Sequence, residues 1–517
     1  MQPVAAVSNT PILRISALLA TLTIAIGLVV GSFLRQPGYT DAYYYFNAAQ
    51  RIAQGKGLTD AALWTYFGLP TNLSTLPTPS HLYWMPLASL IESPLGLTFG
   101  GAKLVMLMCF AGLVALASIV GWLIGRTQRT AWLAGLLTLF SGFYFPWWFN
   151  TDTFALYGVI GAGALVAMGL GRTYGKIGWW ALAGVLSGLA HLTRADGLLL
   201  IGILLISSLW PQRPRMSRTK AIRAAAIGLI AYGLVMTPWF IRNLSAVGSI
   251  LPVGGIQTAW MRSYDQIDGY PPGVSLNDFW AWGISNIVGS RIQALTLGTQ
   301  TLIAVEGWIV LTPFMLFALW RRRADPFLSA FILYAIGLHA AMTLIFAFPG
   351  ERGALFHSAT ALLPFWAALG AIGLDGAISW AARRRHWPLT QSKTVFGAAL
   401  IGYAIVLSGI VASRQFAGWN ANGALYRQLA GQLPANAVVM VNDPPAFYYQ
   451  TGLAAIVVPD NPPDVIPTLA AKYGVTHLIL DVNRTVPMND LYFGSTFPAF
   501  LKLIYDHDGV RIFEIVR

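Results

Sequence analysis

The sequence predicts an all-α membrane domain that crosses the bilayer many times and is followed by a small α/β domain. The 517 residues are 56% hydrophobic and only 10% charged, with a mean hydropathy of +0.59. Charged residues make up about 25% of a soluble globular domain. The composition therefore excludes a soluble globular protein and indicates a polytopic membrane protein.

The apolar runs up to residue 413 are long enough for membrane helices, which need roughly 20 apolar residues each. They predict about eleven transmembrane helices within a single domain, residues 1–413. The predicted spans are residues 11–34, 99–125, 130–146, 153–171, 177–191, 196–210, 222–240, 296–320, 327–348, 355–381 and 394–413.

Basic residues occupy every second connection between these spans, whereas the intervening loops contain most of the acidic residues. Short basic loops remain in the cytoplasm, so the net charge of +13 is mainly a topology signal. Nucleic acid is an unexpected partner for such a chain, and we expect a multi-pass protein of the plasma membrane. The basic connections contain Arg126 and Arg129, Arg172 and Lys176, residues 213–223, Arg321 to Arg323, and Arg383 to Arg385.

The last hundred or so residues have a different pattern. Residues 437–441, 476–480 and 511–516 are short apolar runs typical of buried strands, and residues 463–473 and 497–505 have helical spacing. We predict an α/β domain over residues 414–517. Counting the spans places it on the extracytoplasmic side.

Two predicted outer loops, residues 35–98 and 241–295, are much longer than the others. The first contains an amphipathic stretch at 44–53 and an aromatic segment at 81–86, and the second an aromatic helix at 276–282. These segments are expected to be interfacial helices that cover an outer cavity, although aromatic residues also serve as simple anchors at the membrane surface. The candidate cavity residues in the first loop are Tyr44, Tyr45, His81, Tyr83 and Trp84.

Three carboxylates are candidates for function. Asp41 follows the first span and could act as a base at the membrane surface, but it also stands where a helix cap would stand. Asp152 begins the fourth span and has the same alternative. Glu306 lies inside the eighth span, where an ionisable side chain is a functional candidate by default, with buried packing as the other possibility.

Several features, taken in chain order, resemble the GT-C superfamily of polyprenyl-phosphate-sugar-dependent glycosyltransferases. That group contains the protein O-mannosyltransferases and the lipid A aminoarabinose transferases. The features are Asp41 with the tyrosines that follow it, residues 193–197, residues 238–243, and Arg352 followed by residues 362–364. The resemblance covers most of residues 11–380.

The resemblance implies an inverting sugar transfer from a polyprenyl-phosphate-sugar donor to a lipid, glycan or protein acceptor. Asp41 would take the proton of the acceptor hydroxyl, and Asp152 and Asp196 would line the cavity. No cofactor is firmly expected, and a divalent metal is doubtful because no Asp-x-Asp pair accompanies Asp41. The oligosaccharyltransferase signature Trp-Trp-Asp-Tyr-Gly is also absent, which favours a monosaccharide donor.

A donor phosphate requires positive charge, and arginine can bind it through paired hydrogen bonds. Arg194 has a competing role in an ion pair with Asp196 or Asp152, and Arg242 could simply mark the end of a span. The candidate phosphate-binding residues are Arg194, Arg352, Lys103, His357 and Arg242.

Two other classes of function stay open at this point. The chain could be a lipid or polysaccharide transporter or flippase, although it has no internal repeat and few charges in mid-span. It could also be a non-catalytic assembly factor of the cell envelope whose outer domain recruits partners.

Overall fold

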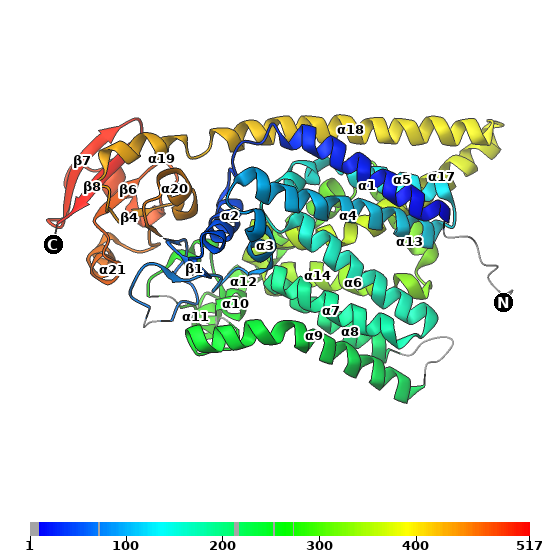
Figure 1. Cartoon of the computed structure of the whole chain (residues 1–517), viewed down its shortest axis with the longest axis horizontal. Helices are drawn as coiled ribbons and strands as arrows, with labels where there is room; N and C mark the ends of the chain where they lie inside the picture. Colours follow the sequence, from blue (N-terminus) through cyan, green and yellow to red (C-terminus); the bar gives the residue numbers. More distant parts are fainter. Residues whose placement is uncertain (1–9, 71–72, 211–216, 252–253, 272, 517) are drawn as a thin grey trace. The chain divides into compact units, whose positions relative to one another are not determined.

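The computed structural model describes residues 10–70, 73–210, 217–251, 254–271 and 273–516 (Figure 1). The chain forms two compact units, each assembled from three separated segments. The first unit contains residues up to 34, 103–238 and 292–416, and the second contains residues 35–102, 239–291 and 417 onward. Arg213 and Arg215 of the predicted basic loop lie outside the described residues.

The first unit is a bundle of apolar helices. Close pairs include α6 with α7, α13 with α17, and α5 with both α1 and α17. Small residues permit this packing, as in many membrane helix bundles: a Cβ added at Gly373 of α17 would lie 2.1 Å from the carbonyl oxygen of Phe314 in α13. The helices that make up or enter this unit are α1 (Thr10–Gly31), α4 (Phe99–Gly125), α5 (Gln128–Leu139), α6 (Phe154–Tyr174), α7 (Ile177–Thr193), α8 (Leu198–Leu209), α9 (Arg218–Val247), α12 (Ile284–Gln300), α13 (Thr312–Arg322), α14 (Ser329–Ala340), α17 (Leu363–Arg385) and α18 (Leu389–Ala421).

The predicted membrane domain is confirmed as an apolar helical bundle, but its number of spans is not. Within the described residues, seven helical segments are long and apolar enough to cross a membrane, and two shorter apolar helices lie at Ile177–Thr193 and Ala195–Leu209.

Several predicted spans do not form continuous α-helices. The span 130–146 ends as α-helix at Leu139 and continues as a 3-10 segment, Gly142–Phe149, that contains Pro146. The span 296–320 is broken after a π-helical turn, Thr301–Glu306, because Trp308 and Ile309 adopt positive φ angles. The hydropathy of a segment shows that it is apolar but does not reveal such local breaks in the helix.

Between α14 and α17 the backbone changes its helical form several times. A π-helical segment, Ala341–Ile345, is followed by α15 (Ala347–Pro349) and a second π-helical segment, Gly350–Ala354, inside which Gly353 has a φ of 127°. The four-residue helix α16 (Leu355–Ser358) then passes into a 3-10 turn, Ala359–Leu362. Irregular helical turns of this kind often accompany functional sites.

The second unit is built on a six-stranded sheet with the order β2-β5-β4-β6-β8-β7. The first four strands of that order pair in parallel, and β8 pairs antiparallel with both β6 and β7. Strands β4 and β6 to β8 appear in orange and red in Figure 1. The strands are β2 (Ala62–Leu63), β4 (Val439–Val441), β5 (Ala455–Val457), β6 (His477–Leu480), β7 (Leu501–His507) and β8 (Val510–Ile515).

The predicted α/β character of the C-terminal residues is confirmed. Strands β4, β6 and β8 lie where they were predicted, and α21 (Ile466–Tyr473) occupies the predicted helix at 463–473. The predicted helix at 497–505 is wrong, because most of it forms β7, which pairs antiparallel with β8. The sheet also takes in β2 from the first long loop, and α18 extends to Ala421.

The long loops contribute their own elements to the second unit. The amphipathic stretch 44–53 lies in α2 (Thr40–Ala53), which packs on α20 (Pro444–Thr451) and on α3 (Leu87–Glu92). The stretch 276–282 lies largely in α11 (Leu276–Ala281), whose Trp280 is exposed. Both predicted helices are confirmed as helices, and their place at a membrane interface stays a prediction.

Candidate functional site

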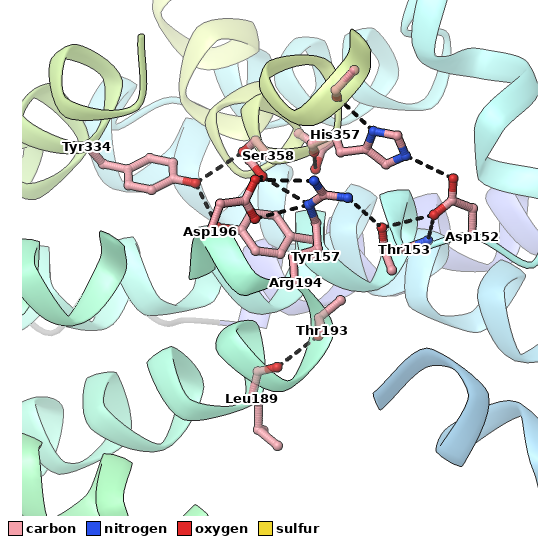
Figure 2. Close-up of polar contacts among 12 residues, drawn as sticks. Asp152, Thr153, Tyr157, Leu189, Thr193, Arg194, Asp196, Tyr334, His357 and Ser358 are labelled. Atoms are coloured by element: carbon pink, nitrogen blue, oxygen red, sulfur yellow. Dashed lines mark hydrogen bonds and ion pairs between the residues drawn. The ribbon is translucent and has the colours of Figure 1, made fainter. Parts of the chain in front are cut away.

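A buried carboxylate–imidazole pair lies inside the first unit (Figure 2). Asp152 lies two residues before the start of α6, and its Oδ2 is 2.9 Å from Nε2 of His357 in α16. Its Oδ1 accepts hydrogen bonds from the backbone N–H and the hydroxyl of Thr153. Thr153, and not Asp152, occupies the N-cap position of α6, so the capping alternative does not account for this carboxylate.

Both ring nitrogens of His357 lie against oxygen atoms. Nδ1 is 2.8 Å from the carbonyl oxygen of Gly353, which can only accept, so Nδ1 carries a proton. Burial raises the pKa of the Asp152 carboxyl, but His357 and the Thr153 N–H outweigh it, and the net shift is downward. Asp152 is therefore a carboxylate, and one of its oxygens lies within hydrogen-bonding distance of Nε2 of His357. Phe154 stacks on the imidazole at 3.9 Å.

A second pair, which is partly buried, lies beside the first. Arg194, at the end of α7, donates through Nε and Nη2 to the two carboxylate oxygens of Asp196 at 3.1 and 3.2 Å. This paired geometry confirms the ion pair that the sequence suggested as one role of Arg194. Ser358 donates its hydroxyl to Asp196, and Arg194 also donates to the hydroxyl of Thr153 at 3.4 Å. The two charge pairs thus belong to one network, as Figure 2 shows.

Two tyrosines extend the network at the Ser358 end. The hydroxyls of Tyr157 and Tyr334 are 2.8 Å apart, and Tyr334 donates to the carbonyl oxygen of Ser358 at 3.3 Å. Sequence reasoning did not single out Tyr157, Tyr334, Thr153 or Ser358. Tyr157 stands one helical turn after Thr153, a spacing that places both on the same helix face, and this was the available signal.

Lys103 and Arg352 differ in their surroundings within the first unit. Lys103 donates to the carbonyl oxygens of Gly31 and Leu34 at 2.8 and 2.7 Å. It therefore satisfies acceptors at the C-terminal end of α1, where a positive charge is favourable. Arg352 is exposed in the second π-helical segment.

Glu306 is almost completely buried and lies between two other elements. One carboxylate oxygen is 3.1 Å from Nε2 of His339 in α14, and the other accepts a 2.6 Å hydrogen bond from the indole N–H of Trp366 in α17. The structure thus places Glu306 in a buried, hydrogen-bonded cluster that ties together the segments around the break at Trp308.

Asp41 lies in the second unit, in the first turn of α2, and is half-buried. The N-cap residue of this helix is Tyr39, so Asp41 does not take the capping position considered from the sequence. A carboxylate in a first helical turn interacts favourably with the helix dipole.

The aromatic residues of the first long loop cluster within the second unit. Tyr44 and Tyr45 are buried, and the backbone N–H of His81 donates to the Tyr44 hydroxyl at 2.7 Å. Trp84 stacks on Trp64 at 3.8 Å. Burial lowers the pKa of His81 to about 3, so its ring is neutral.

A small pocket opens beside this cluster, and Tyr44, His81 and Tyr83 contribute to its lining. Asp60 also lines it, and burial raises the pKa of Asp60 to about 7, against the opposing effects of the Ala62 N–H and Arg51.

Arg242 anchors the loop that contains these residues. Its guanidinium donates to the carbonyl oxygens of Ser80 and Leu58 at 2.7 and 3.3 Å and lies over the Trp239 ring. These contacts give Arg242 a structural use, in line with the alternative that the sequence left open.

Comparison with solved structures identifies the fold. ArnT from Cupriavidus metallidurans bound to undecaprenyl phosphate has a TM-score of 0.54 and 14% identity, over 96% of this chain and 98% of that one. The apo form of the same protein has a TM-score of 0.55 and 13% identity, over 96% of this chain and 97% of that one.

A third similar structure is the archaeal oligosaccharyltransferase AglB from Archaeoglobus fulgidus in complex with an inhibitory peptide and a dolichol-phosphate. It has a TM-score of 0.55 and 14% identity, over 92% of this chain and 70% of that one. No protein-family model and no curated protein sequence matches the chain. The similarity therefore lies in the three-dimensional fold, and the chain has the GT-C fold shared by ArnT and AglB.

Proposed function

We propose that the protein is a membrane glycosyltransferase that moves a sugar from a polyprenyl-phosphate-linked donor to an acceptor hydroxyl, with inversion at the anomeric carbon. Two proteins of the same fold support the lipid class: ArnT was solved with undecaprenyl phosphate and AglB with a dolichol-phosphate. The agreement with ArnT extends over nearly the full length of both chains.

The observation that carries the proposal is the buried charged network of the helical unit. A charged side chain within a membrane helix costs about 2.5–3.5 kcal/mol unless it is compensated, and such residues usually serve function. Here Asp152, His357, Arg194 and Asp196 are gathered in one network. Paired charges satisfy one another, yet an apolar core would hold the helices without them. We therefore infer that this network binds a polar, charged substrate.

In the proposed reaction Asp41 is the general base. The acceptor hydroxyl oxygen forms a bond to the anomeric carbon, while the bond from that carbon to the phosphate oxygen breaks. The hydroxyl proton passes to the Asp41 carboxylate, and polyprenyl phosphate leaves with the bonding electrons. Because phosphate is already a tolerable leaving group, no covalent enzyme intermediate is needed. A positioned base of this kind contributes about 10²–10⁴-fold to a rate.

The donor phosphate would be bound by cations, and Arg194 is our first candidate. An arginine can bind phosphate oxygens through paired hydrogen bonds, and the guanidinium of Arg194 lies in the charged network beside Asp152 and His357 (Figure 2). Arg352 is a second candidate because it is exposed in a segment of irregular helix. For His357, both ring nitrogens already have oxygen partners within the first unit, namely Gly353 and Asp152, so we assign it to holding Asp152 in place.

No metal is required by this proposal. A histidine nitrogen and a carboxylate oxygen are nevertheless ligand types that zinc accepts, and the bond from His357 Nδ1 to a backbone carbonyl is the orientation found in metal-binding histidines. Asp152 and His357 are thus the residues of the first unit that fit a divalent ion. The sidedness of the reaction, on the extracytoplasmic face of the plasma membrane, follows from the distribution of basic loops.

The test uses the full-length protein in vesicles that contain total polyprenyl-phosphate-sugar lipids and glycolipid acceptors extracted from the expressing cells. Products are measured by mass spectrometry. We expect Asp41→Asn to lower the transfer rate at least about 100-fold. The matched control is Asp278→Asn, because Asp278 is also an aspartate in the first turn of a helix of the second unit, and it should leave the rate unchanged.

Transfer by Asp41→Asn at the wild-type rate would remove the proposed base. Movement of unaltered sugar lipid across the vesicle membrane, without any new product, would favour a transporter.

A further inference from the structure

Three consecutive backbone carbonyls around His357 each accept a hydrogen bond from a side-chain hydroxyl. Tyr144 donates to the carbonyl oxygen of Phe356 at 2.9 Å, Thr360 to that of His357 at 2.6 Å, and Tyr334 to that of Ser358 at 3.3 Å. The two tyrosines come from different elements, the 3-10 segment Gly142–Phe149 and helix α14.

The local backbone explains why such support is needed. His357 lies in a helix of only four residues, between a π-helical segment that contains the φ of 127° at Gly353 and a 3-10 turn. Carbonyls at the ends of short helices lack regular partners and must find others when they are buried. The main chain at His357 therefore receives hydroxyl donors, two of them from other elements, in addition to its helical hydrogen bonds.

The side chains nearby reinforce the same position. The Tyr144 ring stacks on Phe356 with a centroid separation of 4.8 Å and an interplanar angle of 13°. Phe154 covers the imidazole of His357, whose Nδ1 is bonded to Gly353. Tyr144 and Tyr334 are both fully buried, so water does not replace their hydroxyls readily.

We infer that Tyr144, Thr360 and Tyr334 are positioning residues that hold the His357 imidazole against Asp152. None of the three contacts the imidazole or the carboxylate through a hydrogen bond of its own; each acts through the main chain. The inference rests on the proposed function for its catalytic meaning, since it assigns to these hydroxyls the geometry of the Asp152–His357 pair.

The test observes His357 directly and needs no sugar transfer. The full chain is labelled with ¹⁵N-histidine and placed in lipid nanodiscs, and the signal of His357 among the seven histidines is assigned with His357→Gln. The measured quantity is the exchange rate of its ring N–H proton with solvent. We expect Tyr144→Phe and Tyr334→Phe each to speed this exchange about tenfold, the effect of losing one hydrogen bond of ordinary strength.

Tyr403→Phe is the matched control, because Tyr403 donates to the carbonyl oxygen of Trp308 at 3.0 Å and not to a residue beside His357. It should leave the His357 signal unchanged. A second pair of variants covers the case in which a tyrosine variant does not assemble. Thr360→Val should speed the exchange, whereas Thr360→Ser, which keeps a hydroxyl, should not.

Wild-type exchange in Tyr144→Phe, Tyr334→Phe and Thr360→Val would overturn the inference. If sugar transfer is also found, the same variants should lower kcat with little change in KM. Faster proton exchange without any detectable transferase activity would leave the positioning role intact and count against the proposed function instead.

Discussion

The buried carboxyl of Asp60 makes the first long loop sensitive to pH. Burial raises the pKa of Asp60 to about 7 in the folded protein, compared with about 3.9 in an unfolded chain. Between these values the folded state binds a proton that the opened state has lost. The stability that this proton contributes is complete below about pH 4 and is lost as the pH rises through 7.

The size of the effect follows from the same two pKa values. Each pH unit within the window changes the opening free energy by about 1.4 kcal/mol, and the slope flattens as the pH approaches 7. From pH 5 to pH 7 the loss is about 2 kcal/mol, or roughly 30-fold in the opening equilibrium. Replacing Asp60 by Asn removes the titration and keeps the approximate shape of the side chain.

Hydrogen exchange measured by mass spectrometry on the peptide 58–67 is the assay, with rates corrected for the intrinsic effect of pH. We expect wild-type protection to fall from pH 5 to pH 7 and the Asp60→Asn protein to show a nearly flat profile. Asp278→Asn, in an exposed turn, should behave as wild type. An equal pH dependence in Asp60→Asn, or protection that rises with pH in the wild type, would refute the reasoning.

Three further outcomes follow from the contacts of the helical unit. Lys103→Met should destabilise the protein by about 1–3 kcal/mol, because it removes the ammonium donor to the carbonyl oxygens of Gly31 and Leu34. A thermal melt in nanodiscs that matches wild type would contradict this. Asp196→Asn should lower thermal stability more than the double variant Arg194→Met/Asp196→Leu does. The single change leaves one charge of the pair without its partner, at a cost of about 3–5 kcal/mol, while an apolar replacement of both partners is tolerated. A double variant that is less stable than Asp196→Asn would count against this ion pair. Glu306→Ala should lower the melting temperature and change the chemical shift of the Trp366 indole N–H in ¹⁵N spectra, because the indole loses its acceptor. An unchanged indole shift would show that this bond is absent.

The class of fold could be predicted from the sequence because it follows from the local composition of the chain. Apolar runs predicted the bundle, and β-branched runs at 437–441 and 476–480 predicted strands that exist. The segment 497–505 was misjudged because its spacing suits a helix, while pairing with β8 decides its conformation. Strand β2 was missed because it has two residues, and its partner β5 is distant in the sequence.

The candidate site was predictable only in part, for a related reason. Arg194 and Asp196 are two residues apart, so their pairing could be anticipated from the cost of a lone charge in a membrane. Asp152 and His357 are 205 positions apart, and nothing in a single sequence links them. The sequence placed His357 among the phosphate-binding candidates, whereas the structure shows its ring bonded to a carboxylate and a backbone carbonyl.

The most direct test of the central claim is the stoichiometry of the lipid carrier. Vesicles containing the purified full-length protein, total polyprenyl-phosphate-sugar lipids and extracted glycolipid acceptors are sampled over time, and free polyprenyl phosphate and glycosylated product are both quantified by mass spectrometry. A glycosyltransferase releases one polyprenyl phosphate for each sugar transferred, and this release should be abolished by Asp41→Asn. Sugar lipids that remain intact throughout, with no carrier released by the wild-type protein, would contradict the account.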